Sequence, residues 1–157
     1  MKQQKKQGFT LIEILIVVAI IAILASVVLV GLGPTQQQGR DARRLSDLRE
    51  TQTALELYYN QNGDYPAASS WGPQTTAGTL SYILVNAGIG VSQVPNDPTN
   101  GKTYYYSQEG GGTSYVIGAV LENASNPAFT GYTVPSVGIP SGMKSCTKAD
   151  SEYCLSL

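Results

Sequence analysis

An uncharged apolar run from Ile14 to Leu32 constrains the fold of this chain more than any other feature. It contains 19 residues and is interrupted only by Ser26 and Gly31. As an α-helix it is about 28 Å long, close to the roughly 30 Å hydrocarbon core of a bilayer. A buried core helix is the alternative, but a chain of 157 residues is too small to cover such a helix on all sides. We therefore expect a membrane-spanning segment.

The charges beside this run indicate its orientation. Lys2, Lys5 and Lys6 precede it, and a positive segment ahead of an apolar stretch holds the N-terminus in the cytoplasm. We expect a single pass that places the rest of the chain outside the cytoplasm. A cleaved secretory signal is the alternative, but the apolar core is too long and no A-x-A sequence ends it.

The composition argues against catalysis and against nucleic-acid binding. The chain has no His, the commonest general base and a frequent metal ligand. The run Gly110–Gly112 lacks the helix and Lys of a phosphate-binding loop. The net charge is −1, which offers phosphates no attraction. Beyond residue 60 the acidic side chains outnumber the basic ones, with Lys102, Lys144 and Lys148 against Asp64, Asp97, Glu109, Glu122, Asp150 and Glu152. We expect no cofactor, no metal, no nucleic-acid partner and no enzymatic activity; a small sugar-cleaving site is the enzymatic alternative.

Glu13 is a carboxylate set directly against the apolar run. A charge close to hydrocarbon is costly, and such charges are usually retained for a partner. The alternative is that the Glu13 side chain merely extends to the lipid headgroups.

The residues Lys5-Lys6-Gln7-Gly8-Phe9-Thr10-Leu11-Ile12-Glu13 resemble the prepilin signature of type IV pilins and type II secretion pseudopilins. The likeness extends over residues 1 to about 33. It implies that prepilin peptidase cuts between Gly8 and Phe9 and methylates the new Phe9 amine. It also implies that Glu13 pairs with the Phe9 amine of a neighbouring subunit during subunit assembly.

The same resemblance implies where the protein is found and what it contacts. The precursor would sit in the inner (cytoplasmic) membrane and would then enter a homo-oligomeric helical filament, a pilus at the cell surface or a pseudopilus in the periplasm. Its partners would be prepilin peptidase and the pilus or type II secretion assembly machinery. Whether the filament is a pilus, a secretion pseudopilus or a DNA-uptake pseudopilus stays open, as does whether the subunit is major or minor.

Four segments are expected along the chain. They are a leader (1–8), a transmembrane and assembly helix (9–33), an amphipathic half of the same helix (34–60) and a polar head (61–157). The helix would run from Phe9 to Asn60 and be loosened or kinked at Gly31–Pro34, because Pro removes one amide. Its buried face is expected to hold Ala42, Leu45, Leu48, Leu55 and Tyr58 or Tyr59, while Arg43, Arg44, Asp47, Glu50 and Glu56 would face solvent.

The head is expected to combine a short helix with a small antiparallel sheet. Residues 77–87 favour the helix. Residues 103–107 and 114–121 flank a Gly-rich connection and predict a hairpin, in which both faces of the second strand are partly covered. Residues 129–139 predict a weak third strand at an edge, since Pro135 and Pro140 interrupt it. The expected fold class is α+β, and the resemblance implies a pilin-like arrangement of one long helix on this sheet.

Residues 60–123 are similar, more loosely, to the major pseudopilin of type II secretion. That likeness implies a calcium-binding acidic loop after the last strand of the hairpin. Here the corresponding residues 121–126 offer one carboxylate, Glu122. Calcium binds about six to eight oxygen ligands, and several of them are usually carboxylates. We expect no calcium.

Cys146 and Cys154 form an even, closely spaced pair near the C-terminus. In a head outside the cytoplasm such a pair predicts a disulfide. Two free thiols or two metal-binding thiolates are the alternatives. A C-terminal disulfide loop resembles type IV pilins more than it resembles the major pseudopilin.

The function expected from these features is that of a structural filament subunit, inserted in the membrane as a precursor and polymerised through its apolar helix. The alternative is an uncleaved single-pass membrane protein that carries a small binding head and stays monomeric.

Overall fold

The structure, a computed structural model, describes residues 8–136 and 138–157, except for the side chains of residues 27–31. It divides into two units, Met1–Gln36 and Gln37–Leu157. Each is described by itself below, and the second is called the folded unit. The boundary after Gln36 lies close to the predicted division at residue 34, but the four functional segments of the chain remain a prediction.

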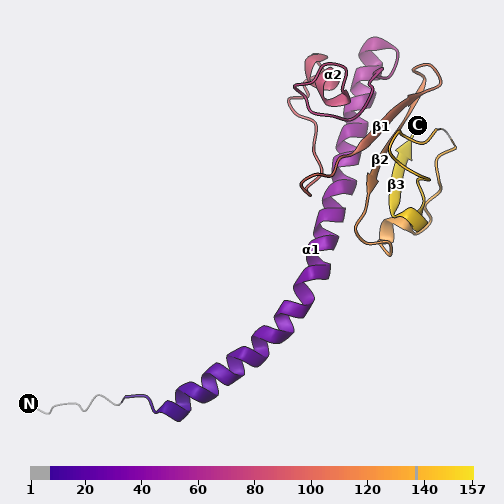
Figure 1. The fold of residues 1–157 in the computed structure, drawn as a ribbon. Coiled ribbons are helices and arrows are strands. Elements are labelled where there is room, and N and C mark those ends of the chain that lie inside the picture. Colours follow the sequence, from indigo (N-terminus) through magenta and orange to yellow (C-terminus); the bar gives the residue numbers. More distant parts are fainter. Residues whose placement is uncertain (1–7, 137) are drawn as a thin grey trace, which may run out of the picture. The chain divides into compact units, whose positions relative to one another are not determined.

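One helix, α1, extends from Leu11 to Asn62 (Figure 1). The predicted single helix from Phe9 to Asn60 is therefore confirmed, with both ends shifted by two residues. Pro34 lies inside α1, where its ring removes one amide from the hydrogen-bond ladder. The end of α1 is marked by Gly63 at φ +82°, whose N–H donates to the Tyr59 carbonyl at 2.8 Å. This is the left-handed closing turn that glycine favours.

Three antiparallel strands form the sheet, in the order β1 (Tyr105–Glu109), β2 (Ser114–Val120) and β3 (Glu152–Ser156). In the register, Tyr106 pairs with Ile117 and Gly118 pairs with Cys154. The predicted hairpin and the α+β class are confirmed. A short helix, α2 (Leu80–Asn86), lies inside the predicted range 77–87. Thr79 is its N-cap, and the Thr79 hydroxyl accepts from the Tyr82 N–H at 3.3 Å.

The prediction of a third strand at 129–139 is wrong. Residues 127–129 form a single 3₁₀ turn, and the described residues from 130 to 139 contain no strand. Pro135 has no N–H to donate to a ladder within this range, and Pro140, directly after it, lacks one as well. The third strand is instead Glu152–Ser156, a short segment that contains Cys154 and pairs with β2.

The core of the folded unit lies between α1 and one face of the sheet. Five consecutive residues of β2, Tyr115 to Ala119, are buried. Alternate side chains of a strand point to opposite faces, so Tyr115, Ile117 and Ala119 join the main core while Val116 packs with the two cysteines. The main core also contains Leu48, Leu55, Tyr65, Trp71, Leu80, Leu84, Tyr104 and Tyr106. The prediction that both faces of this strand are covered is confirmed.

The prediction of which α1 residues face solvent is partly wrong. Leu48 and Leu55 are buried as expected, but Ala42 is exposed, whereas Arg44 and Asp47 are buried. Glu56 is half-buried and accepts from the Tyr65 hydroxyl at 3.1 Å. Polar residues occupy the inward face because each finds a hydrogen-bonding partner there, which offsets the cost of removing it from water. Arg43 and Glu50 are exposed, as predicted.

Candidate assembly site

The N-terminal end of α1 carries the residues expected to direct assembly. Gly8, Phe9 and Thr10 precede the helix and are exposed, Phe9 to 85%. Among the described residues, and leaving aside its chain neighbours, no atom lies within 4 Å of the position that a Cβ on Gly8 would take. The bond between Gly8 and Phe9 is therefore open to an approaching molecule in the described part of the chain.

Thr10 and Glu13 bind each other across the first turn. The Thr10 N–H and the Thr10 hydroxyl both donate to Glu13 Oε2, at 2.8 Å and 2.7 Å, and the Glu13 N–H donates to the Thr10 hydroxyl at 3.3 Å. This reciprocal arrangement is a capping box, which satisfies amides that the first turn of a helix leaves unpaired. The sequence Thr10-Leu11-Ile12-Glu13 matches its S/T-x-x-E pattern, so this pattern is the signal from which the role of Thr10 can be predicted.

Only one oxygen of the Glu13 carboxylate is used by this cap. Both bonds from Thr10 end on Oε2, and Oε1 has no hydrogen-bond partner among the described residues. A carboxylate can accept at both oxygens. Glu13 is therefore held in a defined position by its own chain and keeps one oxygen for another donor.

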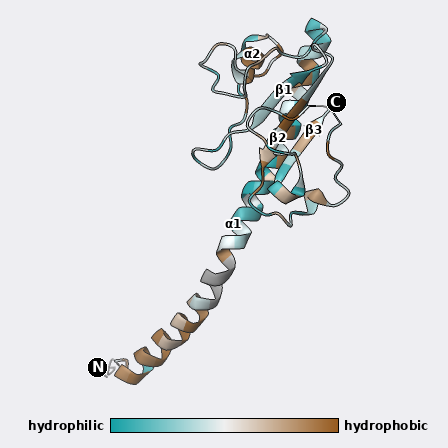
Figure 2. Cartoon of the chain, turned by 45° about the vertical axis from the view of Figure 1, so that its right-hand side comes forward, coloured by the Kyte–Doolittle hydropathy of each residue, from teal (hydrophilic) through white to brown (hydrophobic). Residues whose placement is uncertain are grey.

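Apolar side chains cover the helix after Glu13 on all sides. Ile14 to Leu24 includes nine large aliphatic residues, each more than half exposed: Ile14, Leu15, Ile16, Val17, Val18, Ile20, Ile21, Ile23 and Leu24. Figure 2 shows this hydrophobic stretch at the start of α1. Across the described residues, no helix has an apolar stretch long enough to cross a membrane. The predicted span includes residues 27–31, whose side chains lie outside the described part.

A buried ion cluster, made of Arg40, Asp41, Arg44, Asp97 and Glu122, anchors two loops to α1. The Arg44 guanidinium is fully buried. Its Nε and Nη2 bind Asp97 at 2.7 and 2.9 Å, and its Nη1 binds Asp41 at 2.8 Å and Glu122 at 2.9 Å. Asp41 also accepts the backbone N–H of Glu122 at 2.8 Å. The loop after β2 is thus fastened through both its main chain and its side chain.

The charges of this cluster are strongly coupled. Hydrogen bonds from Arg40 and then from Arg44 lower the pKa of Glu122 to about 2, although burial opposes this shift. Burial alone would lower the pKa of Arg44, but the hydrogen bonds that Arg44 donates to Asp97, Glu122 and Asp41 outweigh it and raise that pKa. The stability of the cluster therefore depends on the charges of Glu122 and of the two guanidinium groups.

Glu122 is the one carboxylate of residues 121–126, the segment for which we expect no calcium. It accepts from Arg40 Nε at 2.7 Å and from Arg44, so guanidinium groups occupy both of its oxygens. Among the residues that the structure describes, no group of three or more acidic or Cys side chains is arranged to hold a metal ion.

Cys146 and Cys154 form the predicted disulfide, with Cα atoms 5.6 Å apart. The buried carboxylate of Glu152 holds the segment that leads into this bridge, because it accepts the N–H groups of Lys144, Ser145 and Cys146 at 2.8–2.9 Å. Gly118 leaves room for the bridge: a Cβ there would lie 3.0 Å from Cys154 Sγ and 2.4 Å from Met143 Sδ.

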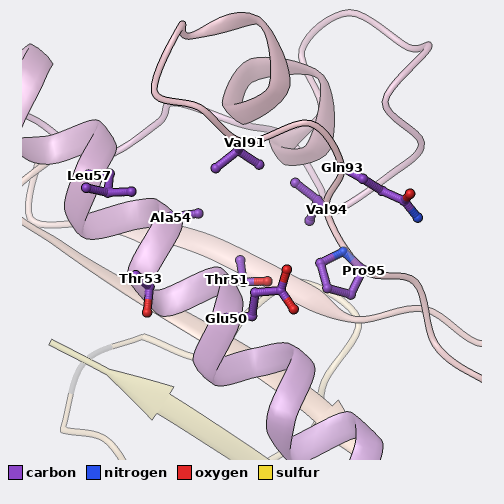
Figure 3. A pocket seen from close by; sticks show the side chains of 9 residues that line it. All are labelled: Glu50, Thr51, Thr53, Ala54, Leu57, Val91, Gln93, Val94 and Pro95. Carbon is purple, nitrogen blue, oxygen red and sulfur yellow. The ribbon is translucent and has the colours of Figure 1, made fainter.

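A groove of about 230 Å³ lies between α1 and the segment 91–95 (Figure 3). Ala54, Leu57, Val91 and Val94 supply much of its apolar lining, and Glu50 is its one ionisable side chain. Acid–base catalysis usually combines two titratable groups whose environments differ, and the groove does not provide such a pair.

Comparisons with known proteins agree with the N-terminal geometry. Residues 3–29 match the family described as the prokaryotic N-terminal methylation motif. The type II secretion system core protein G of Klebsiella pneumoniae is 31% identical over 114 residues, which cover 73% of this chain and 75% of that protein. The type IV wide pilus major component PilA4 of Thermus thermophilus is 35% identical over 85 residues, covering 52% of this chain and 65% of that protein.

Other relatives match over a shorter range. The core protein G of Aeromonas hydrophila is 33% identical over 66 residues, and the chain spans about half the length of this and several other curated relatives that it matches. No solved structure is significantly similar. The match over three quarters of the Klebsiella protein, together with the methylation motif, establishes that this chain belongs to the pilin-like family that includes type II secretion system core protein G and the type IV pilin PilA4.

Proposed function

We propose that this chain is a structural subunit of a type IV pilus or of a type II secretion pseudopilus. The observation that carries the proposal is that Glu13, one oxygen of which is bound by Thr10, is followed directly by a helix whose large apolar side chains are each more than half exposed. Such a surface must be covered by lipid or by protein, because water does not solvate it favourably. Identical apolar helices can replace lipid around it when a subunit leaves the membrane.

The precursor is inserted in the inner membrane through residues 9–33, with the folded unit outside the cytoplasm. Support comes from the uncharged sequence 14–32 and from the lysines that precede it. Prepilin peptidase removes residues 1–8, and the Phe9 amine is then methylated. This step leaves a cation at the end of the chain, next to Thr10.

Glu13 and Phe9 act together in assembly. Oε2 of Glu13 is bound by Thr10 of the same chain, and Oε1 accepts the Phe9 amine of the neighbouring subunit. In a low-dielectric bundle of apolar helices, a lone charge is penalised far more than a paired one. The pair therefore sets the register between helices that are otherwise alike along their length.

The test compares protein from cells with and without a prepilin peptidase. Mass spectrometry of sheared filaments should identify a methylated Phe9 as the first residue. Gly8→Val should block removal of the leader, because the added branched side chain does not fit a narrow protease cleft, whereas Gln7→Ala should be processed normally. Filaments that retain residues 1–8, or a monomeric uncut protein in membranes that contain the peptidase, would favour the uncleaved single-pass alternative.

A further inference from the structure

Two Asn-Gly pairs occur in the chain, Asn62-Gly63 and Asn100-Gly101, and the structure places them in different environments. Asn-Gly is the dipeptide most open to attack of the backbone on the side-chain amide, because glycine has no Cβ to obstruct it. We propose that Asn100 is a site of spontaneous deamidation and that Asn62 is protected from it by the end of α1.

The reaction balances without any cofactor. The Gly101 nitrogen loses its proton to solvent base and attacks the Asn100 side-chain carbonyl carbon. An N–C bond forms, the C–Nδ2 bond breaks, and the amide nitrogen leaves as ammonia after taking a proton from water. Water then opens the cyclic imide at either carbonyl and produces aspartate or isoaspartate. No electrons are gained or lost, and the net change is one water consumed and one ammonia released.

Asn62 is restrained at both reacting groups. Its Nδ2 donates to the Tyr58 carbonyl at 2.9 Å, and the N–H of Gly63 donates to the Tyr59 carbonyl at 2.8 Å. Before the Gly63 nitrogen can lose its proton and attack, the second of these bonds must break, and rotation of the side chain breaks the first. Both bonds are part of the hydrogen-bonded end of a long helix.

Asn100 has neither restraint. Asn100 and Gly101 are exposed and occupy the centre of a turn that is closed by the Lys102 N–H donating to the Thr99 carbonyl at 3.1 Å. Within the described residues, neither the Asn100 side chain nor the Gly101 N–H has a hydrogen-bond partner. Gly101 has φ +78°, close to the +82° of Gly63, so the hydrogen bonds and not the glycine conformation distinguish the two pairs.

Deamidation of Asn100 would alter the loop that contributes Asp97 to the ion cluster. Asp97 and Thr99, which precede Asn100, bind Arg44 at 2.7 and 2.8 Å. Deamidation adds a negative charge to the turn, and isoaspartate adds one carbon to the main chain there.

The experiment follows both sites in one sample. Purified full-length protein is incubated at mildly alkaline pH, and peptide mapping by mass spectrometry measures conversion of Asn to aspartate and isoaspartate over time. If one net hydrogen bond of about 1 kcal/mol protects Asn62, Asn100 should react about fivefold faster or more. The rate at Asn100 should rise with pH, since the deprotonated amide attacks.

The control is the same protein unfolded in denaturant. There the two Asn-Gly pairs should react at similar rates, because the difference arises from the fold and not from the dipeptide. Asn100→Gln should abolish the reaction at that position, and Asn62→Gln should leave it unchanged. Equal rates in the native protein, or faster conversion at Asn62, would overturn the proposal whether or not the chain forms filaments.

Discussion

At the scale of single residues, Glu13 is the side chain on which assembly should depend most. Glu13→Gln keeps the shape of the side chain and the acceptor for Thr10 but removes the charge offered to the Phe9 amine. We expect membrane insertion to be unchanged and filament yield to fall at least about tenfold, which corresponds to about 1.4 kcal/mol per subunit added. Membrane fractionation and shearing of filaments measure the two quantities.

Glu50→Gln is the matched control for Glu13, because Glu50 is an exposed carboxylate of the same helix. It should assemble normally. Normal filament yield from Glu13→Gln would show that Glu13 only reaches toward the lipid headgroups and has no partner in the filament.

Arg44 is the residue on which the folded unit depends most. Arg44→Leu leaves the buried carboxylate of Asp41 without its cation and removes the bidentate partner of Asp97. We expect the free energy of unfolding to fall by about 3–5 kcal/mol, the usual cost of breaking a buried ion pair from one side. Chemical denaturation of the full chain in detergent, followed by tyrosine or tryptophan fluorescence, measures this loss.

Arg43→Leu provides the comparison one position away. The side chain of Arg43 is 64% exposed and lies 3.8 Å from Asp47. Exposed pairs contribute little, so this variant should change the free energy of unfolding by no more than about 0.5 kcal/mol. Similar losses from the two substitutions would mean that burial of the Arg44 guanidinium does not stabilise the fold.

At the scale of elements, β3 depends on the Cys146–Cys154 disulfide, whose second cysteine lies within the strand. Replacing both cysteines by Ala should lower the stability of the folded unit by about 2–3 kcal/mol, because the cross-link no longer restricts the unfolded chain. The β1–β2 hairpin and α1 should persist. Circular dichroism and hydrogen exchange check this, and alkylation of the native protein without a reductant should label neither thiol.

Glu152 also stabilises the region of the disulfide, because its carboxylate accepts the N–H groups of residues 144–146. Glu152→Gln keeps one oxygen but removes the charge that three successive N–H groups share, so we expect a loss of about 1–3 kcal/mol in the free energy of unfolding. Asp64→Asn is a suitable comparison, since Asp64 is exposed, and its effect should be close to zero. Unchanged stability in Glu152→Gln would show that water replaces the carboxylate without loss.

At the scale of the whole molecule, the stability of the folded unit should depend on pH at both extremes. Arg40 and Arg44 hold the folded pKa of Glu122 at about 2, below the ordinary value of 4.5. A depressed pKa contributes stability above the unfolded value, and this contribution is lost as pH falls from about 4.5 through about 2. Glu122→Gln should remove part of this acid dependence.

The loss of stability expected at alkaline pH follows from the buried tyrosines. Burial raises the pKa of Tyr115 to about 12 from 10.0, and burial also raises the pKa values of Tyr104 and Tyr106. A raised pKa contributes stability that is complete below the unfolded value, so stability should decline above pH 10.0. Denaturant midpoints across the pH range should therefore form a plateau, and a midpoint independent of pH at both ends would contradict the assignment.

Local patterns in the sequence determined those elements that are specified by residues close together in the chain. The uncharged run predicts a helix with apolar residues on all sides, the string from Lys5 to Glu13 identifies the family, and two β-prone segments around a Gly-rich turn predict the hairpin. The capping box of Thr10 and Glu13 is equally local. Each depends on residues within a few positions of one another, and so on propensity and periodicity alone.

Only the tertiary structure decided which charged residues are buried and which segment completes the sheet. Arg44 is buried because Asp97 and Glu122, more than 50 positions away, meet its guanidinium, and helical periodicity contains no information about such partners. Residues 152–156 form β3 because they align with the open edge of β2, whereas 129–139 is interrupted by Pro135, which has no N–H to donate to a ladder. The two Asn-Gly pairs are identical in sequence and differ only in the hydrogen bonds that the fold provides. Long-range pairing decides these outcomes, since a polar side chain is stable inside a protein only where a partner meets it.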